Sequence, residues 1–393
     1  MRVLYVSHTA IVSGGERSLL DMLAALDGAV EPLLATPPGQ LQELAEARGI
    51  RTTPITGTAG SLRLHPLHAP RALVEMTITA AQVRRAAARH RAELVHANSI
   101  RAGIVLALAS IRRTPTVVHV RDCLPTSRVS EATLRLLAST ATTVLANSRY
   151  TAASVRAMAP RARLEVVHNA VDLERFDPQR IDRATARRRL AAPDGGPPLL
   201  GVVAQISPWK GQETAIEALA LLRAEDVDAR LLLVGGAKFV SAATRYDNEA
   251  YLARLRALVV DAGLEDRVVW LGEREDVPEI VRALDVLLLP SWEEPFGRAV
   301  VEALALEVPV VATAVGGPRE IVEDGCEGYL VAPREPQAWA EAIRRVLESP
   351  DRGATMGRAG RSRVEREFTF SQHARKLLDV YRRAGEPSAE RRA

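Results

Sequence analysis

The stretch "DVLLLPSWEEPFGRAVVEALALEVPVVAT", residues 285–313, contains the pattern that decides the fold. An apolar run of strand length ends at Pro290, a polar loop continues to Gly297, and a helix of 3.6-residue period begins near Arg298. A second apolar run follows the helix. Strand, helix and strand in this order predict two parallel strands with a crossover helix. One residue breaks the pattern, because Glu302 places a carboxylate among the apolar residues of the helix.

The same alternation extends over almost the whole chain. Runs such as "RVLYVS", "PTVVHV", "PLLGVVAQ" and "ARLLLVGG" alternate with helical stretches such as "ERSLLDMLAAL" and "GQETAIEALALLRAE". The runs exceed what one doubly wound sheet holds, and the composition changes at residues 183–200. We therefore expect an α/β protein of two Rossmann-like domains, residues 1–172 and 173–370. Helix 371–385 is expected to cross back to the first domain, and residues 386–393 to be disordered.

The composition restricts the class of protein. Hydrophobic residues make up 47% of the 393 residues, which is enough for two buried cores. No stretch reaches the roughly 18 uncharged apolar residues that a membrane-spanning helix needs, so we expect a cytoplasmic protein. Cys123 and Cys326 lack the spacing of a zinc site or a disulfide framework. A net charge of +4 with only 4% aromatic residues does not favour binding to nucleic acid.

One segment is locally basic. Arg84, Arg85, Arg89 and Arg91 crowd the end of a predicted helix. Cations at this position complement the carboxyl end of a helix and form a solvated face. The alternative is docking to an anionic membrane, which would make the protein peripheral at the inner membrane face. Both interpretations stay open at this level.

Ligands of such sheets bind beyond the carboxyl ends of the strands, so the loop after residue 290 is a candidate site. The amino end of the following helix presents free N–H groups and the positive end of the helix dipole, which suit a phosphate. Glu302, about one turn into the helix, can accept hydrogen bonds from a ribose, and Glu294 remains on the other side of the phosphate. The loop residues expected at this anion site are Glu294, Pro295, Phe296, Gly297, Arg298 and Ala299.

The string "EPFGRAVVEA" resembles the E-x7-E signature of the family 4 retaining glycosyltransferases, with Glu294 and Glu302 as its two glutamates. The segment "SPWKGQETAIEAL" places Lys210 at the position of the diphosphate-binding lysine of that family. The resemblance covers nearly the whole chain. It implies the GT-B fold, in which two Rossmann-like domains face each other across a cleft.

The resemblance also implies the reaction. A sugar would pass from a nucleoside diphosphate sugar, with UDP preferred over GDP, to an acceptor with retention of the anomeric configuration. Lys210 and the helix end would stabilise the leaving diphosphate, so we expect no metal and no cofactor. Glu294 would orient the sugar hydroxyls, and the leaving phosphate would take the acceptor proton. Small molecules, glycans and lipid-linked intermediates all remain open as acceptors.

Further donor contacts are implied by the resemblance. The family commonly carries an arginine five residues before the lysine, where this chain has Gln205, so the diphosphate clamp lacks one cation. Either Arg298 takes over part of the charge or backbone amides hold the leaving group. The remaining implied donor-side residues are Gly14 and Gly15 in a glycine-rich loop, Gly235 after a strand, and Glu273 and Arg274 near the base.

The first domain carries the predicted acceptor side. Many relatives end the strand "PTVVHVRD" with a histidine, whereas this chain has Arg121 followed by Asp122. We predict that both touch the transferred sugar or the acceptor and that they act in catalysis with Lys210 and Glu294. His119 projects to the same face as Arg121, and either a neighbour satisfies it or it contacts the acceptor. The other predicted acceptor-side residues are His8, His96 and Asn98.

Two other functions fit the same architecture. One is a sugar-nucleotide epimerase, and the other is a catalytically silent binding protein of the GT-B fold. Gln205 and the altered "HVRD" strand favour the silent protein. Release of a nucleoside diphosphate that depends on the acceptor separates these functions from a transferase.

Overall fold

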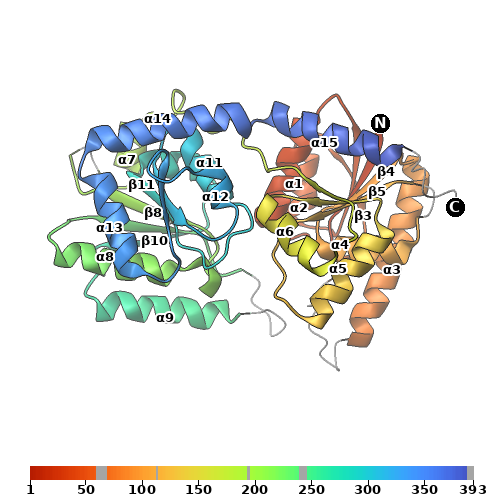
Figure 1. Cartoon of the computed structure of the whole chain (residues 1–393), viewed down its shortest axis with the longest axis horizontal. Helices are drawn as coiled ribbons and strands as arrows, with labels where there is room; N and C mark the ends of the chain where they lie inside the picture. Colours follow the sequence, from red (N-terminus) through yellow and green to blue (C-terminus); the bar gives the residue numbers. More distant parts are fainter. Residues whose placement is uncertain (59–68, 112–113, 193–194, 239–245, 387–393) are drawn as a thin grey trace. The chain divides into compact units, whose positions relative to one another are not determined.

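The computed structural model describes residues 1–58, 69–111, 114–192, 195–238 and 246–386 (Figure 1). The chain divides into two compact units, one comprising Met1–Ala170 with Phe370–Ala393 and the other Val171–Thr369. We call them unit 1 and unit 2. The first division lies two residues before the boundary predicted at 172/173. The tail predicted as disordered lies, except for residue 386, outside the described residues.

Unit 1 is built on a seven-stranded parallel sheet. Its strands are β1 (Arg2–Val6), β2 (Glu31–Thr36), β3 (Arg51–Pro54), β4 (Leu94–Ala97), β5 (Thr116–Val120), β6 (Thr143–Ala146) and β7 (Leu164–Val166). They lie in the order β3-β2-β1-β4-β5-β6-β7. Its helices are α1 (Gly14–Ala25), α2 (Gln40–Glu46), α3 (Ala69–His90), α4 (Ile100–Ala109), α5 (Arg128–Thr140), α6 (Arg149–Met158) and α15 (Phe370–Gly385).

The helices of unit 1 cover both faces of its sheet. Apolar residues of α3, α4, α5 and α6 pack on one face, and those of α1, α2 and α15 pack on the other. Helix α15 is last in the chain but lies beside α1, as Figure 1 shows. Leu377, Val380 and Tyr381 of α15 are buried against the strands. The carboxyl-terminal helix therefore completes the core of the amino-terminal unit.

Unit 2 contains a six-stranded parallel sheet. Its strands are β8 (Leu199–Val203), β9 (Arg230–Val234), β10 (Val268–Gly272), β11 (Val286–Leu289), β12 (Val310–Thr313) and β13 (Gly328–Val331), in the order β10-β9-β8-β11-β12-β13. Its helices are α7 (Arg183–Arg189), the 3-10 helix η1 (Pro208–Lys210), α8 (Gln212–Ala224), α9 (Asn248–Asp261), α10 (Val277–Ala283), α11 (Arg298–Ala305), α12 (Pro318–Ile321), α13 (Pro336–Leu347) and α14 (Pro350–Glu367). Helices α8, α9 and α13 cover one face, and α7, α10, α11 and α12 cover the other.

The predicted fold class, an α/β protein with two parallel sheets, is confirmed. Two strands fall outside the apolar runs of the sequence, and both lie at the edge of a sheet. Strand β3 reads "RTTP" and is polar, whereas β13 reads "GYLV" and its two middle residues, Tyr329 and Leu330, are only half-buried. Within the described residues, no helix is both long and apolar enough to cross a bilayer.

Candidate functional site

Two charged residues meet beyond the carboxyl edge of the unit 2 sheet. Lys210 ends η1 after β8, and Glu294 lies in the loop after β11, the parallel neighbour of β8. Lys210 Nζ and Glu294 Oε2 are 2.6 Å apart, and their side chains are 14% and 10% exposed. Ser291 Oγ donates to the same carboxylate oxygen at 3.1 Å, and Lys210 Nζ lies 3.9 Å from the ring centroid of Trp209. The folded unit thus pairs the predicted diphosphate cation with the predicted sugar-orienting carboxylate.

Glycines after β12 hold the backbone of the Glu294 loop. The carbonyl of Glu294 accepts a hydrogen bond from Gly317 N at 2.8 Å, and its own N–H donates to Val315 O at 3.3 Å. A Cβ atom on Gly316, whose φ is +106°, would lie 2.0 Å from the carbonyl oxygen of Glu294. On Gly317 it would lie 2.4 Å from Phe296 Cα. Only glycine allows this approach, so the pair fixes where Glu294 stands.

Helix α11 begins at Arg298, as predicted, behind Gly297 with φ at +104°. The first N–H groups of any helix lack partners within that helix, so this end can receive an anion. Arg298 Nη2 lies 2.9 Å from Glu302 Oε1, and the two side chains are 21% and 14% exposed. The carboxylate that interrupts the apolar pattern is therefore paired with the arginine one turn earlier.

The loops after β8 and β9 also require glycine. A Cβ atom on Gly211, with φ at +70°, would lie 2.0 Å from Pro290 O, and one on Gly235, with φ at +133°, would lie 2.1 Å from Ala204 O. Gln205, which replaces the arginine of the family pattern, accepts a hydrogen bond at its backbone carbonyl from the side chain of Gln212, at 2.8 Å. These contacts bring the loops close to one another at the edge where Lys210 lies.

The residues predicted near the base form two separate ion pairs. Glu273 Oε2 lies 3.3 Å from Lys238 Nζ. Arg274 donates to both carboxylate oxygens of Asp276, at 2.7 and 2.6 Å. Hydrogen bonds from Arg274 hold the pKa of the Asp276 carboxyl below its usual value. Both predicted residues lie directly after β10, where Gly236 after β9 approaches the side chain of Glu273.

Unit 1 has its own polar network beyond the carboxyl edge of its sheet. Arg121, 7% exposed, donates from Nε to Asn98 Oδ1 at 3.0 Å and from Nη1 to Asn169 Oδ1 at 2.9 Å. Asn98 Nδ2 donates to Gly15 O at 3.3 Å. Asn147 Nδ2 donates to Arg121 O at 3.2 Å. Three predicted residues, Arg121, Asn98 and Gly15, are thus brought together, and the network adds two asparagines.

Sequence reasoning did not single out Glu16 or the two added asparagines. Glu16 is 5% exposed and its Oε2 accepts from the N–H and Oγ of Ser13, at 3.1 and 2.5 Å. Burial raises the pKa of the Glu16 carboxyl. The Ser-x-x-Glu spacing in "SGGE" is a helix-start signal that could have identified it. Asn147 and Asn169 each follow the end of a strand, where the same rule that selected Asn98 applies.

His96 and His119 require a correction. Both are 0% exposed, because α15 covers their face of the sheet, so neither presents an atom to an acceptor. His96 Nδ1 is hydrogen-bonded to Tyr381 OH at 2.7 Å. The prediction that a neighbour satisfies His119 is wrong, since neither ring nitrogen has a partner among the described residues. Burial, and then the charge of Arg121, lowers the pKa of both histidines far below the usual value.

His8 and Asp122 keep their predicted places at strand ends. His8, two residues after the end of β1, is half-buried with Nδ1 at 2.9 Å from Ser99 Oγ. Burial, followed by the charge of Arg101, lowers the pKa of His8 to about 3, so its ring is neutral near pH 7. Asp122 is exposed after β5 and acts on Arg101 by charge attraction. Gly14 also has open surroundings, since a Cβ atom there would meet nothing within 4 Å.

Only one group in the described part of the chain has three ligand atoms close enough to hold a metal ion. Glu323, Cys326 and Glu327 offer atoms within 4.8 Å of one another. Arg363 Nη1 already lies 3.3 Å from Glu327 and 3.8 Å from Glu323. None of the predicted donor or acceptor residues belongs to this group, and we assign no metal to it.

Comparison with known proteins places this arrangement in a family. Residues 182–363 match the model described as glycosyl transferases group 1, and residues 12–175 match that of glycosyltransferase family 4. The D-inositol 3-phosphate glycosyltransferase of Salinispora arenicola is 30% identical over 354 residues, which cover 83% of this chain and 76% of that protein. The chain belongs to the family 4 glycosyltransferases.

Solved glycosyltransferases have the same architecture, which confirms the expected GT-B fold. HepE from Anabaena in complex with UDP-glucose superposes with a TM-score of 0.82 at 28% identity, over 98% of this chain and 100% of that chain. The 2-deoxystreptamine glucosyltransferase of Streptomyces kanamyceticus is 32% identical over 222 residues, 56% of this chain and 54% of that protein. In its alignments with three other D-inositol 3-phosphate glycosyltransferases, the chain spans only about half the length of each relative.

Proposed function

We propose that the chain is a retaining glycosyltransferase that transfers a hexose from a UDP-sugar to a hydroxyl group of a cyclitol. The observation that carries this proposal is the Lys210–Glu294 pair, held 2.6 Å apart on the loops of two adjacent strands. One partner supplies positive charge for a diphosphate and the other supplies oxygen atoms for sugar hydroxyls. The UDP-glucose complex of HepE supports a uridine donor.

In the proposed reaction, the bond between the anomeric carbon and the diphosphate oxygen breaks. A bond from the acceptor oxygen to that carbon forms on the same face of the sugar. The acceptor proton passes to an oxygen of the leaving diphosphate, so no side chain has to act as base. Lys210 and the first N–H groups of α11 stabilise the charge that collects on the leaving group. Because these groups supply the positive charge, we propose that the reaction requires no metal ion.

Donor binding would redistribute the two ion pairs of the site. The diphosphate competes with Glu294 for Lys210, which frees the Glu294 carboxylate to orient the hydroxyls of the sugar. The ribose hydroxyls donate to Glu302, which releases Arg298 toward the phosphates. Arg298 would then replace part of the charge that Gln205 lacks. In each step a carboxylate exchanges its ion pair for hydrogen bonds from hydroxyl groups, and the released cation turns to the phosphates, so no carboxylate is left buried without a partner.

The proposed acceptor class rests on two relatives. Inositol 3-phosphate and 2-deoxystreptamine, which appear in the names of those proteins, are both six-membered carbocycles with several hydroxyl groups. In unit 1, His8 and Asp122 offer a neutral ring and a carboxylate for such hydroxyls. Arg121 acts mainly as a positioning residue, since its Nε and Nη1 groups already donate to Asn98 and Asn169.

The donor half of the proposal is tested by thermal shift with a panel of nucleotide sugars. We expect a UDP-sugar to raise the melting temperature of the parent and to raise that of Glu302→Ala much less. Glu249→Ala, which removes an exposed glutamate from α9, is the matched control and should behave as the parent. Equal shifts in the parent and in Glu302→Ala would remove Glu302 from the ribose role.

The transfer half is tested by UDP release with inositol 3-phosphate or 2-deoxystreptamine as acceptor, in the presence of a metal chelator. Release that requires the acceptor supports the transferase. The second candidate, a silent nucleotide-sugar-binding protein, is favoured by the missing cation at Gln205. Donor binding without release of UDP for any cyclitol would favour that candidate, and loss of activity with the chelator would contradict the metal-free reaction.

A further inference from the structure

The outward face of α3 carries two rows of exposed side chains. The first row is Leu73, Thr77, Arg84 and Ala88, and the second is Val74, Ile78, Arg85 and Arg89. In both rows the spacing is i, i+4, i+11 and i+15, so each stays on one stripe of the helix, because 11 residues make about three turns. Leu73, Val74 and Ile78 are 60%, 58% and 45% exposed. The second row therefore changes along the helix from apolar to basic, whereas the first row begins with Leu73 and carries a single arginine, Arg84.

These two rows do not take part in packing α3 on the sheet. The opposite face of α3 is buried on the sheet through residues such as Ala80, Val83 and Ala87. Thr79 Oγ adds a hydrogen bond to Gly57 O at 2.9 Å. Three of the ten large hydrophobic residues that are exposed in the described part of the chain nevertheless gather on this one helix. An apolar cluster beside like charges on an outer face indicates an interaction surface.

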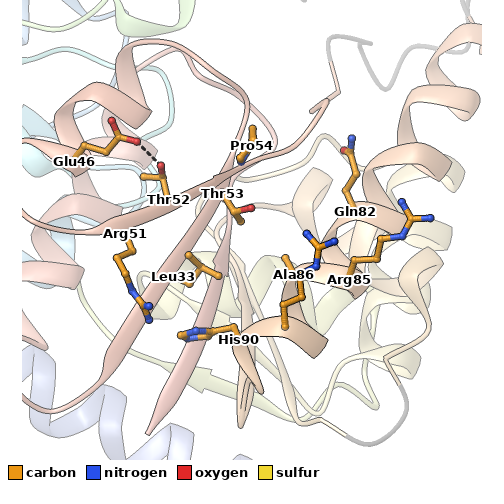
Figure 2. Close-up of a pocket in the computed structure, with 11 residues that line it drawn as sticks. Leu33, Glu46, Arg51, Thr52, Thr53, Pro54, Gln82, Arg85, Ala86 and His90 are labelled. Atoms are coloured by element: carbon orange, nitrogen blue, oxygen red, sulfur yellow. Dashed lines mark hydrogen bonds between the residues drawn. The ribbon is translucent and has the colours of Figure 1, made fainter.

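A pocket of about 680 Å³ lies beside the basic end of the second row, between α3 and the edge strand β3 (Figure 2). Arg85 and Arg89 line it together with Arg51. Arg51 is paired with Glu31 at 2.6 Å, and the acidic lining residue Glu46 accepts a hydrogen bond from Thr52 at 2.5 Å. Within the described residues no ion pair engages Arg85 or Arg89. The pocket thus offers two uncommitted guanidinium groups.

We propose that this surface docks the protein on an anionic phospholipid bilayer. Val74, Ile78 and Leu73 enter the boundary between headgroups and acyl chains, and Arg85 and Arg89 bind lipid phosphates at the mouth of the pocket. Arginine suits phosphate because its planar guanidinium donates two parallel hydrogen bonds. Helix α3, 22 residues and about 33 Å long, would lie flat in the interface. The inference is independent of the donor and the acceptor.

Charge complementarity selects the bilayer over other occupants. A second copy of this chain packed through the same face would offer no anion to Arg85 and Arg89, because neither row contains a carboxylate. A neutral apolar partner would leave the arginines desolvated without anions. The three exposed apolar residues cover a small area and the arginines carry a modest charge. Neither the apolar contact nor the charge alone is enough for binding to a bilayer. Binding should therefore require anionic lipid and should be sensitive to salt.

The test is co-sedimentation of the full chain with vesicles of phosphatidylcholine alone or of phosphatidylcholine and phosphatidylglycerol in equal parts. We expect binding only to the anionic vesicles, and loss of binding at about 1 M salt, where charges are screened within about 3 Å. The pair Arg85→Gln with Arg89→Gln should lower partition about thirtyfold. The pair Val74→Asn with Ile78→Asn should also lower it. Melting temperatures of the variants verify their folding.

Matched controls come from the other unit. Arg352→Gln with Arg358→Gln removes two exposed arginines of α14, and Val260→Asn removes a valine of α9 that is 59% exposed. These variants should bind as the parent does. Failure of the parent to bind anionic vesicles, or equal losses in the controls, would overturn the proposal. So would inorganic phosphate binding that depends on Arg85 and Arg89 without vesicle binding, or a dimer that Ile78→Asn dissociates.

Discussion

At the scale of single residues, the two charges on which the proposed chemistry depends hold each other in the unliganded chain. Lys210 and Glu294 are mostly shielded from water, so their attraction is screened less than that of a surface pair. The pair keeps both side chains in place at the edge of the sheet. It also means that removing one partner leaves the other shielded and uncompensated, apart from the Ser291 hydroxyl that still donates to Glu294.

We expect Lys210→Ala to lower kcat about 10²- to 10³-fold, because one preorganised cation on the leaving group disappears. Initial rates of UDP release measure this change. Lys376→Ala, which removes an exposed lysine of α15, is the control and should keep the parent rate. A Lys210→Ala enzyme with an unchanged kcat would contradict the role of Lys210 in stabilising the diphosphate.

At the scale of elements, the position of Glu294 depends on a contact with the loop after β12. We expect Gly316→Ala to lower the free energy of unfolding by at least about 3 kcal/mol, because φ is +106° and the new Cβ would meet the Glu294 carbonyl at 2.0 Å. Urea denaturation measures the change. Donor affinity should fall in the same variant, since the loop has to shift.

Gly263→Ala is the control that measures the cost of a side chain at a positive φ without a steric contact of its Cβ atom. Gly263 also has a positive φ, +61°, but a Cβ atom there would meet nothing within 4 Å. This variant should lose only about 1 kcal/mol and keep its donor affinity. If Gly263→Ala and Gly316→Ala lower the free energy of unfolding equally, the close approach of Gly316 to Glu294 makes no contribution to stability.

At the scale of the whole molecule, the last helix of the chain seals a group of buried histidines in the first unit. His96, His119 and His373 are at most 5% exposed. Burial is the main cause that lowers the pKa of each, and it lowers that of His373 to about 4. Unfolded histidine has a pKa of about 6.5, so the unfolded chain takes up protons first as the pH falls. The contribution of these neutral, buried histidines to the free energy of unfolding is therefore fully present above about pH 6.5. It is lost progressively as the pH falls from there toward about 4.

We expect each of these histidines to remove about 1.4 kcal/mol of stability per pH unit within that window. Glu16 acts in the opposite direction, because its raised pKa favours the folded state when the carboxyl is protonated. His119→Leu should reduce the slope by about 1.4 kcal/mol per pH unit. It should also stabilise the protein slightly at pH 7, because two unsatisfied ring nitrogens leave the core. Urea unfolding between pH 7.5 and 5 measures both effects, and parallel pH profiles for parent and variant would contradict them.

The local pattern of the chain predicted most of the elements and part of the site. Buried parallel strands are continuous apolar runs, so they are visible in the sequence, whereas the polar edge strand β3 is not, and β13 is a short edge run that was not singled out. Strand ends predicted the positions of Glu294 and Asn98 because the carboxyl ends of parallel strands share one edge, whereas Lys210 was identified through the family resemblance. Glu16 was missed although its capping-box spacing is local.

By itself, then, the sequence determined the two parallel-sheet domains, the start of α11 and the residues that line the strand ends, because these follow from periodicity within a short segment. Only the tertiary structure decided the partners. The pairs Lys210–Glu294 and Tyr381–His96 join residues separated by 84 and 285 positions. No local signal encodes such contacts, since they exist only after the sheets have formed and α15 has covered the face that contains His96 and His119.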